Sequence, residues 1–246
     1  FFLLTSKYSN KIGNGLLLDQ DFDKPQAFHS LSIARSGGLA AIISFSIFYL
    51  LNYLMFNKIN FEYVVLSLSM FSLGFIEDIK LEIKPLYRLL LMILVLSTVV
   101  IYFSITISSI DLNFLNIWFK NQIFAFSFVL LCFLFIINGA NIIDGFNGLL
   151  AIHILIINII LLLINLESNH EELSIIIASQ IVILVSFLLF NFPNAKIFLG
   201  DGGSYLFGSL VALNIIETNN LNTDISSFFF CILLFYLFFE VFFSFF

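Results

Sequence analysis

Four polar residues recur at every third position near the middle of a chain that is otherwise almost entirely apolar. They are Asn138, Asn141, Asp144 and Asn147. Residues three apart are neighbours on a helix, where each such step turns about 60° around the axis. Polar groups inside a membrane are costly, and we therefore interpret this run as a working site that meets a ligand.

Glycines in the same run indicate where its helix stops. Four residues at this spacing wrap half of a straight helix, so they cannot all face one ligand. Gly145 and Gly148 indicate that the helix ends or bends near Asp144. A plainer interpretation is a helix end among lipid headgroups with an Asn-Gly cap. That interpretation explains one Asn-Gly pair but not the spaced set.

A second polar segment, Phe198–Ser204, carries a single carboxylate among glycines. Asp201 is followed by Gly202 and Gly203 and precedes a helix that we expect to begin near Tyr205. Glycine lets the backbone approach a ligand, and a helix N-terminus offers N–H donors to an anion. Asp201 could there bind a hard cation such as Mg²⁺, shared with substrate phosphates. The alternative is an ordinary turn, because Asp-Gly and Gly-Gly are common turn dipeptides.

A third group combines acidic and basic residues at the end of another apolar run. Glu77 and Asp78 could bind a metal or act as a base, and Lys80, Lys84 and Arg88 could hold phosphate. The alternative is that the acidic residues only mark the exit from the membrane. The basic residues would then anchor a loop beside anionic lipid.

A fourth polar segment runs from Asp23 through His29 to Gly38. Its last residues, Gly37 and Gly38, lead into an apolar run. A flexible cytoplasmic loop and a substrate-binding segment are both open interpretations of it.

The composition places nearly all of the chain in lipid. Hydrophobic residues make up 61% of it, charged residues 11%, and the mean hydropathy is +1.08. A soluble domain carries about 25% charged residues. Basic residues are few and scattered, which indicates no nucleic-acid partner.

Continuous apolar runs predict a polytopic helical membrane protein. A helix needs about 20 apolar residues to cross a bilayer. We expect one all-α membrane domain over residues 1–246, with helices at about 39–56, 60–76, 86–107, 121–138, 148–165, 173–190, 205–217 and 226–246. Phe1–Leu4 resembles the tail of a truncated N-terminal span, and Phe242–Phe246 stops within apolar sequence, so both ends predict a fragment.

The basic residues predict which side each loop faces. If the spans alternate, eight Lys and Arg lie on one side and two on the other, namely Lys58 and Lys120. The positive-inside rule assigns the richer side to the cytoplasm. All four polar segments then lie on that side, in loops at about 5–38, 77–86, 139–148 and 191–204, which predicts a single cytoplasmic site.

These four segments, in this order, resemble the polyprenyl-phosphate N-acetylhexosamine-1-phosphate transferases. That family also contains the phospho-N-acetylmuramoyl-pentapeptide transferase of peptidoglycan synthesis. The likeness extends over essentially the whole chain, and the last two segments are specific only in combination. The residues that carry it are Lys24-Pro-Gln26, His29, Arg35–Gly38, Gly74–Asp78, Asn138–Leu149 and Phe198–Ser204.

The resemblance implies a reaction. A polyprenyl phosphate attacks the β-phosphate of a UDP-N-acetylhexosamine, UMP leaves, and a polyprenyl diphosphate sugar forms as the first membrane step of surface polysaccharide or cell-wall synthesis. Mg²⁺ is required, with Mn²⁺ as an alternative. The implied location is a bacterial inner membrane with the site facing the cytoplasm, and a second copy of the chain is a candidate partner.

The resemblance also implies roles for individual residues. Asp201, with Asp144, is the expected Mg²⁺ ligand. Glu77 and Asp78 match paired aspartates proposed to receive the lipid phosphate's proton or to order the site, and Asp144 joins them as a catalytic candidate. The residues expected to bind substrate are Asn141, Asn138, Asn147, Lys84, Arg88 and Gly202.

Three departures from the family pattern bear on these roles. Glu77 stands where Asp is usual, and its longer side chain moves the carboxylate, so Asp78 is the stronger candidate. Asn147 stands where many members have a second Asp, which argues against a base there and favours the surface-polysaccharide branch. The family's last cytoplasmic loop, with its histidine motif, would lie beyond Phe246.

Two alternatives from other classes stay open. A transporter would place polar groups near the bilayer midplane, often in paired repeats, whereas here they gather at one interface and no repeat is seen. An inactive relative kept as a scaffold is the other alternative, and Glu77 and the missing last loop are the departures that favour it.

Overall fold

The computed structural model describes residues 1–8, 17–19, 33–81, 83–108 and 110–244, and these are mostly helical. Two short antiparallel strands pair Leu18 with Ala34 and Asp19 with Ile33. The predicted all-α class is confirmed. The elements are α1 (Phe2–Tyr8), β1 (Leu18–Asp19), β2 (Ile33–Ala34), α2 (Gly37–Phe56), α3 (Phe61–Asp78), α4 (Pro85–Tyr102), α5 (Asn113–Phe119), α6 (Gln122–Ile143), α7 (Leu149–Glu167), α8 (Glu171–Asn191), α9 (Gly200–Leu221), α10 (Ser227–Leu233) and α11 (Phe235–Phe243).

Five helices in the described part of the chain are long and apolar enough to cross a membrane: α2, α4, α6, α7 and α8. The mean hydropathy of their most apolar 18-residue windows runs from 1.9 to 2.8. Two of the other expected spans, α3 and α9, are less apolar, because α3 carries Glu62, Glu77 and Asp78 and α9 contains the Asp201 segment. The protein is a multi-pass helical membrane protein.

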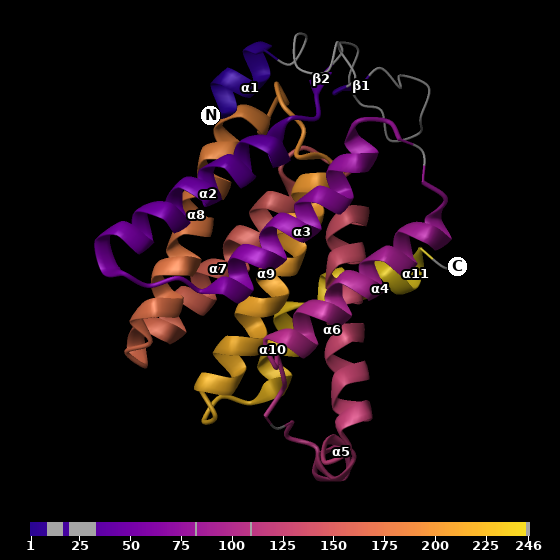
Figure 1. The fold of residues 1–246 in the computed structure, drawn as a ribbon, viewed down its shortest axis with the longest axis vertical. Helices are drawn as coiled ribbons and strands as arrows, with labels where there is room; N and C mark the ends of the chain where they lie inside the picture. Colours follow the sequence, from indigo (N-terminus) through magenta and orange to yellow (C-terminus); the bar gives the residue numbers. More distant parts are fainter. Residues whose placement is uncertain (9–16, 20–32, 82, 109, 245–246) are drawn as a thin grey trace.

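Helix α9 forms the centre of the bundle. It packs against α3, α6, α2 and α7, and in Figure 1 it lies behind α3 near the middle of the view. Every residue from Gly202 to Ile216 is buried. A helix that is buried on all sides needs close neighbours, and small residues allow them. A Cβ on Gly208 would lie 3.0 Å from the Cβ of Ala140 in α6.

Buried amide side chains join α7, α8 and α9. Asn214 donates to Gln180 Oε1 at 2.7 Å and to Asn158 Oδ1 at 3.1 Å, and Asn158 donates to Gln180 Oε1 at 3.1 Å. Towards the C-terminal end of α9, Asn165 donates to Thr218 Oγ1 at 2.8 Å. Between membrane helices such bonds satisfy groups that water cannot reach. They also fix the rotation of α9 against its two neighbours.

The expected helix at 86–107 is wrong at its C-terminal end. Helix α4 stops at Tyr102, and Ser104 has a positive φ of 53°. The segment that follows is held by Asn220 of α9, which accepts from the Ser108 N–H at 2.9 Å and donates to the Thr106 carbonyl oxygen at 2.6 Å. These bonds stabilise a non-helical path that hydropathy alone does not reveal.

The single helix expected over 226–246 is also wrong. The chain forms two helices, α10 and α11, with a break at Leu234. The break lets α11 pack against α6, where Leu237 lies against Gly139. A Cβ on Gly139 would come within 2.5 Å of the Leu237 carbonyl oxygen. Tertiary packing therefore overrides an apolar run that is long enough for one span.

Two other boundaries move without changing the topology. The helix expected at 121–138 continues to Ile143, so Asn141 lies on α6 rather than in a loop at 139–148. The short segment expected at 205–217 extends in both directions to 200–221. Both extensions carry polar motif residues onto helix ends, where their side chains are fixed.

Candidate active site

Asp78, the last residue of α3, binds the N-terminus of α9. Its Oδ1 accepts the backbone N–H of Asp201 at 2.9 Å, and its Oδ2 accepts that of Gly202 at 2.8 Å. The free N–H donors of a helix N-terminus favour an anion, and here the Asp78 carboxylate fills that role. From the sequence, these N–H groups were expected to bind a ligand. In the structure they bind Asp78 and so join the α3 and α9 motifs.

Gly74 and Gly200 allow this contact between α3 and α9. A Cβ on Gly74 would lie 2.2 Å from the Asp201 carbonyl oxygen. Gly200 has a φ of +76°, and a Cβ there would lie 2.6 Å from Asp78 Oδ1. Neither glycine was predicted as a site residue, although Gly74 opens the acidic segment and Gly200 precedes Asp201. Gly202, expected to bind substrate, contributes its backbone N–H to Asp78.

Asn141 of α6 orients the Asp201 carboxylate. Its Nδ2 donates to Asp201 Oδ1 at 2.7 Å and to Ser204 Oγ at 3.1 Å. Asp144 lies at the end of the same helix, close enough for the charges of Asp201, Asp78 and Arg35 to act on it. The central motif and the Asp201 motif therefore meet at one place, as the expectation of a single site predicts.

The other two members of the polar ladder bond elsewhere. Asn138 Nδ2 donates back to the Leu134 carbonyl oxygen of its own helix at 2.7 Å. Asn147 Nδ2 donates to the Pro193 carbonyl oxygen at 3.2 Å and so ties the α6–α7 turn to the α8–α9 segment. Asn138 lies one step back along α6 from Asn141, and Asn147 lies beyond the end of that helix, in the turn before α7.

Glu77 lies between Arg88 and Asp201. Arg88 Nη1 donates to Glu77 Oε2 at 2.7 Å. The other oxygen, Glu77 Oε1, is buried and has no hydrogen-bond partner among the described residues. Arg88 is therefore bound to a carboxylate at the site. Lys84 is exposed at the residue before α4.

The carboxyl groups of the site repel one another. Burial, followed by the charge of Asp201, raises the pKa of Asp78 to about 7, although two backbone N–H groups and Arg35 act against this. Burial, with the charges of Asp201 and Asp78, raises the pKa of Asp144 well above its usual value. Burial also raises the pKa of Glu77, and the adjoining Asp201 adds to the effect while Arg88 opposes it. A bound cation would relieve this repulsion.

The residues present fit Mg²⁺. The described part of the chain has no group of three or more His, Cys, Asp or Glu side chains placed to hold a metal ion. Mg²⁺ does not need one, because it usually takes one or two carboxylates together with water and substrate phosphates. The orphaned Glu77 Oε1 beside Asp201 supplies oxygen donors of that kind. The charge of Asp201 also acts on Asp144, the remaining carboxylate of the site.

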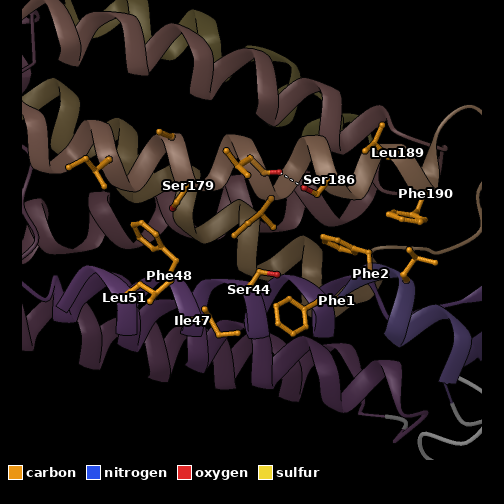
Figure 2. A pocket seen from close by; sticks show the side chains of 15 residues that line it. Phe1, Phe2, Ser44, Ile47, Phe48, Leu51, Ser179, Ser186, Leu189 and Phe190 are labelled. Atoms are coloured by element: carbon orange, nitrogen blue, oxygen red, sulfur yellow. Dashed lines mark hydrogen bonds between the residues drawn. The ribbon is translucent and has the colours of Figure 1, made fainter. Parts of the chain in front are cut away.

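A separate apolar groove lies away from these acidic residues. It has a volume of about 690 Å³ between α1, α2 and α8, and Figure 2 shows Phe1 and Phe2 near one end and Phe48 and Leu51 near the other. The hydroxyls that line it bond within their own helices, as Ser186 does to the Val182 carbonyl oxygen. The groove is therefore an apolar surface whose hydroxyl groups are already hydrogen-bonded.

Lys24, Gln26 and His29, which the resemblance also singled out, lie outside the described residues.

Comparison with known proteins identifies a family match over the middle of the chain. The profile of glycosyl transferase family 4 matches residues 60–219, more than half of the chain. Three similar curated proteins are each named phospho-N-acetylmuramoyl-pentapeptide-transferase. The one from Leuconostoc mesenteroides subsp. mesenteroides is 43% identical over 79 residues, which is 32% of this chain and 25% of the relative. The one from Clostridium perfringens is 32% identical over 106 residues, which is 43% of this chain and 33% of the relative.

The third relative matches over a longer stretch. It comes from Clostridium botulinum and is 27% identical over 187 residues, which is 72% of this chain and 57% of the relative. The chain thus spans between a quarter and just over half of the length of these curated relatives. The family match covers Asp78, Asp144 and Asp201, the carboxylates that the fold brings together. The chain belongs to glycosyl transferase family 4.

Proposed function

We propose that the protein transfers an N-acetylamino-sugar 1-phosphate from a UDP-sugar to polyprenyl phosphate and releases UMP. The observation that carries this proposal is the meeting of Glu77, Asp78, Asp144 and Asp201, from three helices, at one place beside Arg35. The names of the curated relatives support transfer of a phosphosugar.

The proposed step is a displacement at phosphorus. An oxygen of polyprenyl phosphate attacks the β-phosphorus of the UDP-sugar and forms the new P–O bond. The bond from that phosphorus to the oxygen bridging to the α-phosphate breaks, and its electron pair leaves with UMP. Such a reaction depends on positioning and on neutralising charge. Mg²⁺, when bound, supplies the charge neutralisation on the diphosphate.

Each acidic residue of the site has its own role in this step. Asp201 and Asp144 would hold Mg²⁺, and Asn141 keeps the Asp201 carboxylate in one orientation. Both oxygens of Asp78 accept N–H groups of α9, so Asp78 fixes the place of Asp201. Glu77 has a free oxygen beside Asp201 and is the better placed of the acidic pair to reach the metal or the lipid phosphate.

Observations outside the site bear on its side of the membrane and on the sugar that is transferred. The Lys and Arg distribution supports a cytoplasmic site, where a soluble UDP-sugar is at hand. The names of the relatives favour UDP-N-acetylmuramoyl-pentapeptide and cell-wall synthesis. Asn147, which stands where many members have Asp, favours a UDP-N-acetylhexosamine and surface polysaccharide instead. Both donors belong in the test.

The test is UMP release by purified protein in lipid vesicles. We expect release from one of the two donor types, only with polyprenyl phosphate and a divalent cation present. Mn²⁺ should replace Mg²⁺ in part. Release that persists in EDTA, or without the lipid phosphate, would refute the mechanism. Wild-type protein that binds Mg²⁺ but transfers nothing from any donor would support the scaffold alternative.

A further inference from the structure

Arg88 was expected to bind substrate phosphate, but in the structure it forms an ion pair with Glu77. Arg88 Nη1 donates to Glu77 Oε2 at 2.7 Å, so part of the guanidinium is already engaged by a carboxylate of the site. The Arg88 side chain is 29% exposed and that of Glu77 only 15%. A charge-assisted bond this sheltered from water holds its partners more firmly than a surface ion pair.

The bond leaves the second oxygen of Glu77 in a defined place. Oε1 is buried and receives no N–H or O–H donor from the described residues, and the carboxyl lies within hydrogen-bond reach of the Asp201 carboxyl, with which it could share a proton when no cation is bound. Two carboxyl groups side by side, one of them with an orphaned oxygen, form an arrangement that a cation completes. Asp201 is itself held by Asn141 at 2.7 Å, so each carboxylate has one anchor from another helix.

Arg88 also compensates for the longer side chain at position 77. Glu has one more methylene than the Asp usual in the family, so its carboxylate reaches about 1.5 Å further and has an extra rotatable bond. Arg88 lies in the first turn of α4, which begins after a short connection from α3. An ion pair across that connection restricts the extra freedom of Glu77.

We propose that Arg88 is a positioning residue, which holds Glu77 Oε2 so that Oε1 faces a divalent cation beside Asp201. This inference rests on the proposed Mg²⁺ site and adds a residue from α4 that acts only through Glu77. Arg88 thus contributes to metal affinity rather than binding the diphosphate of the substrate.

The test measures how much Mg²⁺ raises the unfolding temperature of detergent-purified protein, and separately the Mg²⁺ dependence of UMP release. Partners that orient a metal ligand typically change affinity by about 10–100-fold. We expect Arg88→Met to raise the half-saturating Mg²⁺ concentration by about that factor, with the KM for both substrates little changed. Arg88→Lys should recover part of the loss, because Lys keeps the charge but not the planar fork.

A double-mutant cycle shows whether Arg88 acts through Glu77. The double variant Glu77→Gln with Arg88→Met should need no more Mg²⁺ than Glu77→Gln alone. The matched control is Lys58→Met, which removes the exposed ion pair with Glu172 far from the site. It should leave the Mg²⁺ response unchanged.

Three outcomes would overturn the inference. These are a raised substrate KM with an unchanged Mg²⁺ response, a lower unfolding temperature without any change in Mg²⁺ affinity, and additive effects in the double variant. If Arg88→Met does not fold, the same measurements are made on Arg88→Lys and on the double variant Glu77→Gln with Arg88→Lys. Wild-type protein whose Mg²⁺ stabilisation depends on Arg88, but which transfers no sugar, would support Arg88's role while refuting the proposed function.

Discussion

Replacing Gly74 by Ala tests whether the contact between α3 and α9 sets the position of Asp201. The added Cβ would lie 2.2 Å from the Asp201 carbonyl oxygen and 2.6 Å from the Gly202 Cα. Ordinary van der Waals contact begins near 3.4 Å. Both obstacles are backbone atoms, so no flexible side chain can turn away. The two helices must therefore separate by about 1 Å.

The size of the effect follows from that separation. Inserting a methyl group into a packed interface costs about 1–3 kcal/mol, and a backbone clash should place Gly74→Ala at or above the upper end. The two N–H bonds to Asp78, at 2.9 and 2.8 Å, would lengthen with the same movement. A displacement of about 1 Å at a reacting group can lower the rate about 100-fold. We expect folded protein with a much reduced rate.

Two measurements separate the rate from the stability. UMP release at saturating substrate gives the rate, and the unfolding temperature in detergent gives the stability. Gly145→Ala is the steric control for stability, because the nearest atom to its Cβ would be the Ile142 carbonyl oxygen at 3.9 Å. It should unfold like the wild type. A Gly74→Ala protein with wild-type rate and wild-type stability would refute the close packing of α3 on α9.

Other consequences can be checked in the same preparations. Asp201→Asn should abolish UMP release and the stabilisation by Mg²⁺ while leaving expression intact; full activity would remove Asp201 from the metal site. Asn214→Leu should lower the unfolding free energy by about 1–3 kcal/mol, because it leaves the amides of Asn158 and Gln180 without one partner; an unchanged denaturation midpoint would contradict this. The Asp78 carboxyl binds its proton up to a pH of about 7 when folded but only near its ordinary pKa of 3.8 when unfolded. In EDTA the stability should therefore fall as the pH rises from about 4 to about 7, and Asp78→Asn should flatten that slope; equal slopes would show that Asp78 is not the group responsible.

Sequence reasoning predicted the membrane fold and the meeting of the motifs because both depend on simple patterns. Long apolar runs are sufficient to locate most spans, and alternation of the spans places the polar segments on one side. Asp78 and Asp201 accordingly meet, although they are 123 positions apart in the sequence. The resemblance assigned metal and substrate roles to Asn141 and Asp144, and the structure places both beside Asp201.

Details that depend on tertiary contacts were not accessible from patterns. The spacing of the polar ladder could not show that Asn141 rather than Asn138 faces α9, because both lie on one helix. The partner of Arg88 depends on how α4 leaves α3, which hydropathy does not describe. The break at Leu234 depends on the fit of Leu237 against Gly139. In each case the deciding atom lies on another helix.

The burial of α9 bears on how the protein enters the membrane. A helix that starts with Gly-Asp-Gly-Gly and ends with Glu-Thr-Asn-Asn-Leu gains little from contact with lipid alone, because polar and charged residues oppose insertion as a single segment. Its buried Asn214 and Thr218 find their side-chain partners only once α7 and α8 are in place. Those two helices precede it in the chain and are among the most apolar. During synthesis, α7 and α8 are therefore made before α9, and α9 can insert against them rather than into lipid alone. Asp201 is then the last of the site's four carboxylates to be synthesised.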